Sequence, residues 1–231
     1  MITFSSINLF RKILPVILLV LISTGISTAQ NYKYGVYLAP SITWFSSDIT
    51  EVDNQGSRPG MVYVFNAEKP LNNNLFLTAG LSIVNAGGRL VARDAAPFKF
   101  QNYTAIVAAG EPIVYRIHYL SIPAGFKART NQLGSIFVFG DIGIDPKVVV
   151  LGKVDVPSLD VEKENGMGEI NRFNFGWHLH AGIEYPIGDR TAVALGLGFE
   201  NNFADITKDL GTQVNDRIAH KILKFIFGIN F

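Results

Sequence analysis

Two histidines are the residues of this chain most suited to chemistry. His178 and His180 lie two residues apart in an alternating segment that also contains Glu184. Alternate side chains of a strand point to one face, so these three groups would share a side. Imidazole and carboxylate groups together can bind zinc and related metals. In a narrow interior they more often form hydrogen-bonded networks, because buried polar groups need partners. We favour the network, with no metal and no cofactor.

The predicted network draws on polar residues that share a face with these histidines or lie on the corresponding face of other segments. Acidic and basic side chains both occur in it, so they can neutralise one another inside a protein. The predicted members are Lys33, Lys127, Asp141, His178, His180, Glu184, Glu200 and Lys224.

The other two histidines suggest a hydrolase as the alternative. His118 and Ser121 are close in sequence, but their odd separation puts them on opposite faces of a regular strand. His220 follows Asp216 near the end of a strand, which would place an acid and a base at the rim of the sheet. No hydroxyl group is placed beside them by the sequence. We therefore expect no catalysis, and an enzyme that hydrolyses lipid or peptide remains the alternative.

Eight segments alternate in the manner of strands, and no segment shows a sustained helical period. Most reach the ~9 to 11 residues that a tilted strand needs to cross a bilayer. Short connections alternate with long, polar ones, as in an up-and-down barrel with tight turns at one end. The predicted fold is all-β, an eight-stranded antiparallel up-and-down transmembrane β-barrel. The predicted strands are 32–45, 59–69, 74–84, 113–128, 134–144, 172–185, 191–201 and 218–231.

The two faces of these segments indicate lipid as the solvent. Between 191 and 199, Val193, Leu195 and Leu197 alternate with small residues such as Ala194 and Gly196. A soluble sandwich or lipocalin-like barrel would present polar residues on its outer face. The composition, 48% hydrophobic and 17% charged, is also apolar for a soluble domain. We expect the large residues to face lipid and the small and charged ones to face a crowded interior.

The N-terminus predicts export. Arg11 and Lys12 precede the apolar run 13–22, and small residues end at Ala29. This order is typical of a secretory signal peptide, here 1–29, followed by a barrel domain, 30–231. A membrane anchor is the alternative, but ten apolar residues are too few to span a bilayer. The expected location is the outer membrane of a cell.

Charge and cysteine usage exclude several classes of protein. There is no cysteine, so disulfides, thiolate metal sites and a lipoprotein anchor are excluded. Removing Arg11 and Lys12 with the leader changes the net charge from +1 to −1. No basic patch indicates nucleic acid as a partner.

The last strand resembles an assembly signal. Phe225, Phe227, Ile229 and Phe231 place apolar residues at every second position up to a terminal aromatic residue. The barrel-assembly machinery is therefore an expected partner, alongside outer-membrane lipid. An ordinary lipid-facing strand that ends in Phe is the alternative.

One short motif occurs twice. Glu68-Lys69-Pro70-Leu71 matches Glu184-Tyr185-Pro186-Ile187, and the strands that follow match at the same offset. The pair could be a duplicated site with two glutamates, or two hairpins whose turns use Pro, Asn, Gly and Asp. We favour the hairpins.

The same motifs carry a family resemblance. The repeated motif, the stretch 119–127 (YLSIPAGFK) and the final Phe231 resemble the PorT-like outer-membrane β-barrel family, which is common in Bacteroidetes. This resemblance implies an eight-stranded, OmpA-like barrel in the outer membrane. It also implies a link to secretion or gliding machinery, which the named member of the family serves.

We therefore expect a non-enzymatic structural or docking protein. A narrow channel is a further alternative, but aromatic residues on the inner face would fill an eight-stranded lumen. The best candidates for a contact surface are the long connections 85–112 and 145–172. Their candidate residues are Arg89, Arg93, Phe98, Phe100 and Tyr103 in the first and Asp155, Asp160, Glu162 and Glu164 in the second.

Overall fold

The computed structural model describes residues 32–48, 52–54, 56–93, 95–208 and 217–231. Residues Lys33–Phe231 form one compact unit. The predicted signal peptide lies outside the described residues. Within them, no helix has the length and apolarity needed to cross a membrane.

The described unit is almost entirely β-strand, with one short 3-10 helix. The elements are β1 (Lys33–Ser47), β2 (Val52–Asn54), β3 (Arg58–Pro70), β4 (Leu75–Ala92), β5 (Ala96–Lys99), β6 (Thr104–Val107), β7 (Pro112–Ser121), β8 (Ala124–Arg129), β9 (Phe137–Val156), η2 (Pro157–Leu159), β10 (Val161–Asn165), β11 (Phe173–Pro186), β12 (Ala192–Asn202) and β13 (Ile218–Asn230).

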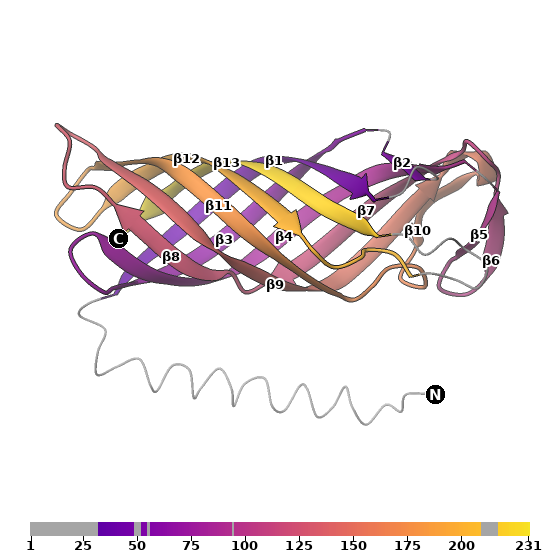
Figure 1. Cartoon of the computed structure of the whole chain (residues 1–231), viewed down its shortest axis with the longest axis horizontal. Coiled ribbons are helices and arrows are strands. Elements are labelled where there is room, and N and C mark those ends of the chain that lie inside the picture. The colour runs from indigo at the N-terminus through magenta and orange to yellow at the C-terminus, as the bar shows by residue number, and fades with distance from the viewer. Residues whose placement is uncertain (1–31, 49–51, 55, 94, 209–216) are drawn as a thin grey trace, which may run out of the picture. The chain divides into compact units, whose positions relative to one another are not determined.

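The long strands close into a ring of antiparallel neighbours (Figure 1). β1 pairs with β3, β3 with β4, β4 with β7 and β8, and these two with β9. The ring continues through β11 and β12 to β13, which pairs back to β1 with Gly35 opposite Asn230. Closure gives each long strand a partner on both sides, whereas the short strands β2 and β10 each pair on one side only. The predicted eight-stranded up-and-down barrel is confirmed.

One barrel strand is interrupted where the sequence predicted a continuous strand, 113–128. β7 ends before Ile122 and β8 begins after Pro123, yet both pair with the same neighbours. Proline has no N–H to donate to a ladder. Backbone bonds still cross the break, since Ile122 N donates to Pro146 O over 3.0 Å and Gly80 N donates to Pro123 O over 2.9 Å.

Two strands run further than predicted. The predicted ends were 84 and 144, but β4 continues to Ala92 and β9 to Val156. The hairpin of β5 and β6, together with β10, lies at this end, opposite the short turns and the C-terminus (Figure 1). The predicted loops 85–112 and 145–171 are therefore partly strand. We call this end the outer end.

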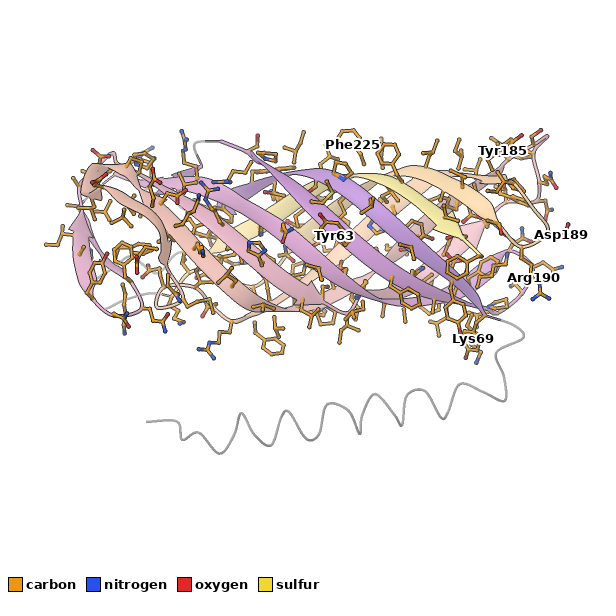
Figure 2. The ribbon with its side chains drawn as sticks, turned by 180° about the vertical axis from the view of Figure 1, so that it is seen from behind. Tyr63, Lys69, Tyr185, Asp189, Arg190 and Phe225 are labelled. Carbon is orange, nitrogen blue, oxygen red and sulfur yellow. The ribbon has the colours of Figure 1, made fainter. Side chains whose placement is uncertain are left out.

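The outside of the wall is apolar, as the alternation predicts. Val36, Leu38, Leu197 and Phe227 are each about half exposed, between 50% and 55%. Figure 2 shows Phe225 projecting from the wall, whereas charged Asp189 and Arg190 lie at the short-turn end. A contiguous apolar belt of this kind is stable only against lipid.

Inside the outer half, aromatic and aliphatic side chains fill the lumen. Phe45 contacts Tyr115 edge-on, with ring centroids 5.5 Å apart, and Phe98 lies 6.2 Å from the same tyrosine. Phe98 and Phe100 are 3% and 0% exposed. The expectation that these two phenylalanines form a contact surface is wrong, because the hairpin of β5 and β6 folds them into this core.

Replacing Phe100 by alanine should release the hairpin. The substitution leaves a cavity in a packed core, which costs about 3 kcal/mol or more. Local opening of residues 96–107 should then become roughly a hundredfold more frequent, as measured by limited proteolysis of the native barrel. Ile106→Ala is the matched control, because Ile106 is 70% exposed. Equal cleavage of the two variants would contradict the packing described here.

Candidate functional site

The lumen of the inner half holds buried charges in three layers. In the layer nearest the short turns, β8 places Lys127 between Glu68 of β3 and Glu184 of β11. Lys127 Nζ binds Glu68 Oε1 at 2.6 Å and also binds Glu184 Oε1. Arg129 Nη1 reaches Glu184 Oε2 at 3.2 Å, and Asn230 Nδ2 donates to Glu184 Oε1 over 2.9 Å. Both oxygens of Glu184 and Oε1 of Glu68 therefore face donors.

The duplicated motif ends in this layer. Glu68 and Glu184 are both buried and bind the same lysine. The turns that follow also match, since Leu71 N donates to Leu75 O over 2.8 Å and Ile187 N donates to Thr191 O over 2.9 Å. The repeat therefore forms two similar hairpins and also brings two carboxylates to one cation.

The second layer is built around His178. Its Nε2 lies 2.7 Å from Asp141 Oδ1, and its Nδ1 lies 2.7 Å from Asp145 Oδ2. Thr78 Oγ1 donates to Asp141 Oδ2 over 3.1 Å. The ring of His180 stacks on that of His178 at 4.5 Å, and its Nδ1 lies 3.5 Å from Asp141 Oδ1. β9 and β11 hold these groups together, with Asp141 directly opposite His180.

The third layer joins the charges to the aromatic core of the outer half. Glu200 of β12 binds two lysines, Lys147 of β9 through Oε1 and Lys224 of β13 through Oε2 at 2.6 Å. Lys147 and Glu200 have almost no exposed surface. Lys147 Nζ also lies over the ring of Tyr119, 5.7 Å from its centroid.

Seven of the eight residues predicted for the network lie in these layers. Lys33 is the exception: it joins none of the ion pairs among the described residues, and its Nζ lies 5.4 Å from the ring centroid of Phe76. Sequence reasoning missed Asp145, Lys147 and Arg129. Their positions in the alternation could have identified them. Asp145 and Lys147 follow Asp141 at every second residue on the inward face, and Arg129 follows Lys127 in the same way.

Among the described hydrolase candidates, His118 does not meet Ser121, and His220 is buried. Ser121 is buried on the lumen side, whereas His118 on the same strand lies on the opposite face and is half-buried. His220 is fully buried, and its Nδ1 lies 3.2 Å from Tyr119 Oη. The prediction that His220 lies at an open rim is therefore wrong, because β13 carries it into the aromatic core. Asp216 lies outside the described residues.

The sequence matches one family model. Residues 28–208 match the outer membrane protein beta-barrel domain. The chain belongs to this family. It is an outer-membrane β-barrel protein, which agrees with the closed ring and the apolar outer wall.

Solved structures of similar fold are distant in sequence. Neisserial surface protein A is 12% identical, with a TM-score of 0.47, and the match covers 85% of this chain and 95% of that one. Ail, the attachment invasion locus protein of Yersinia pestis, is 11% identical, with a TM-score of 0.42 over 87% and 100%. The outer membrane protease OmpT from Escherichia coli is 7% identical, with a TM-score of 0.44 over 88% and 97%. A search of curated protein sequences finds no significant match.

Proposed function

We propose that this barrel is a non-enzymatic docking protein of the outer membrane, with the outer end as its contact surface. The PorT-like resemblance adds that its partner belongs to secretion or gliding machinery. The observation that carries the proposal is the filled lumen: ion pairs occupy the inner half and aromatic residues the outer half. An eight-stranded barrel filled in this way can act only through its two ends and its outer wall.

The placement of the four histidines supports a role without catalysis. His178 is bound by two carboxylates, His180 stacks on it, and His220 is buried against Tyr119. His118 faces away from Ser121. A hydrolase that uses a side-chain nucleophile needs that group and a base within hydrogen-bond reach at an accessible surface, and the described histidines provide no such pair.

The hairpin of β5 and β6 supports docking at the outer end. Its buried Phe98 and Phe100 anchor it, while Tyr103 and Ile106 are 47% and 70% exposed. Tyr103 stacks on Phe100 with ring centroids 4.6 Å apart. Exposed apolar groups on an anchored hairpin bind a partner with little loss of conformational entropy.

Affinity purification of the tagged barrel from cross-linked outer membranes tests this function. The native protein should recover secretion or gliding components, and Ile106→Asp should recover at least tenfold less. Ile187→Asp is the control, because Ile187 is 59% exposed in a short turn. Recovery of nothing specific would favour a structural role, and a loss confined to Ile187→Asp would place the contact at the other end.

The assembly signal gives a separate prediction. Phe225, Phe227, Ile229 and Phe231 all face outward and are 40% to 51% exposed. Deleting Phe231 should slow insertion several-fold without changing the final fold, because its side chain lies outside the lumen. Heat-modifiable migration on gels, followed over time after induction, measures insertion. Unchanged kinetics would contradict the assembly role.

A further inference from the structure

We propose that Asp141, His178 and His180 bind one divalent transition-metal ion of the zinc class in the barrel lumen. One ligand atom from each residue lies within 4.8 Å of the other two. The three residues come from paired strands, β9 and β11, so the sheet ladder fixes their spacing. Two imidazoles and one carboxylate, with one open position, form a common zinc ligand set.

Two of the three separations between ligand atoms are close to those of a zinc site. Asp141 Oδ1 lies 2.7 Å from His178 Nε2 and 3.5 Å from His180 Nδ1. Around a tetrahedral zinc with bonds of about 2.0 Å, ligand atoms lie about 3.3 Å apart. Without metal, a proton bridges His178 Nε2 and Asp141 Oδ1. The ion takes the place of this proton, which leaves to solvent.

The remaining atoms of two ligands are already held as a metal site requires. His178 Nδ1 pairs with Asp145 Oδ2 at 2.7 Å, and Thr78 Oγ1 donates to Asp141 Oδ2 over 3.1 Å. A zinc-bound histidine usually donates its other N–H to a carboxylate, which orients the ring and raises its basicity. Asp145 would have this role.

Space and charge at the site also fit a cation. The three residues line a cavity of about 80 Å³, which has room for a water molecule as a fourth ligand. Lys127 and Lys224 line the same cavity, but each already binds a glutamate at 2.6 Å. His180 Nε2 is buried with no hydrogen-bond partner among the described residues, so no hydrogen bond at that nitrogen fixes the orientation of the ring.

This metal site differs from the metal-free network that the sequence favours. The sequence grouped both histidines with Glu184, but Glu184 binds Lys127 and Arg129 instead. Asp141 takes its place as the carboxylate ligand.

Cobalt substitution tests the site. The barrel, purified from outer membranes with a tag that lacks histidine and stripped with a chelator, is titrated with Co²⁺ and then Zn²⁺. One equivalent of Co²⁺ should give the intense visible absorption of a tetrahedral site, and Zn²⁺ should remove it. His180→Gln should weaken binding at least a hundredfold, and Asp145→Asn by about 10- to 100-fold.

The control is His118→Gln, which changes a histidine on the opposite side of the wall and should bind like the native protein. Heat-modifiable migration verifies that each variant is folded. A spectrum of hydrated cobalt alone would overturn the proposal. So would binding by folded His180→Gln that equals native binding.

Discussion

Replacing Lys127 by methionine should lower the free energy of unfolding by about 3 to 5 kcal/mol. The change removes the cation shared by Glu68 and Glu184 and leaves two carboxylates in a lumen where both are nearly unexposed. Breaking a buried ion pair from one side costs this much because the remaining charge stays desolvated. Urea unfolding of the barrel in lipid vesicles, followed by tryptophan fluorescence, measures the loss.

Two further variants test whether the loss of stability comes from the unpaired buried carboxylates rather than from the removal of any lysine. Lys69→Met removes an exposed lysine next to the same turn and should change stability by less than about 0.5 kcal/mol. Adding Glu68→Gln to Lys127→Met should restore part of the lost stability, since Glu184 and Arg129 then remain in the layer as a neutral pair. A loss in Lys127→Met no larger than in Lys69→Met would contradict the described layer.

Replacing Glu200 by glutamine should be comparably damaging, by about 3 to 5 kcal/mol. Glu200 is the carboxylate that binds both Lys147 and Lys224, and all three side chains are at most 8% exposed. Two ammonium groups would then face one another across a neutral amide. The same urea titration measures the effect, with exposed Glu162→Gln as the control.

A second substitution tests the cause. Lys147→Met in the Glu200→Gln background removes one of the two unpaired cations and should recover stability. If the double variant is less stable than Glu200→Gln alone, repulsion between the lysines does not explain the loss. The comparison therefore distinguishes charge imbalance from a packing defect.

The alternation of residue size along each segment was enough to predict the barrel. A strand that crosses lipid must satisfy its backbone through its neighbours and present apolar groups outward. Val193, Leu195 and Leu197 do so, while Ala194 is fully buried inside. The small inward residues leave room for long charged side chains from neighbouring strands. This constraint acts residue by residue, so the sequence reveals it directly.

The outer end was harder to predict because its strands no longer have to present apolar side chains to lipid. Beyond 84 and 144 the sequence contains Gly87-Gly88 and Asp145-Pro146-Lys147, which are typical of loops. In the structure Asp145 and Lys147 point into the lumen, where ion pairs stabilise them. Phe98 and Phe100 pack against a core that is formed by distant strands. Such contacts depend on tertiary structure, which local patterns do not encode.

The candidate site was predictable as a set of inward polar residues but not as specific pairs. The alternation of side chains along a strand predicted that His178, His180 and Asp141 lie on one surface of the wall. Strand register decides which of them meet: β9 and β11 set Asp141 opposite His180, and β8 brings Lys127 rather than a metal to Glu184. Register depends on the turns and on the packing of the whole ring.

Single-channel recording in planar lipid bilayers tests most directly whether side chains block the lumen of this outer-membrane barrel, so that the protein works through its surfaces. With the native protein inserted, we expect no stable conductance above the background of the bilayer. A large, stable conductance would contradict it, because an open path for ions cannot coexist with the three charged layers and the aromatic core described here.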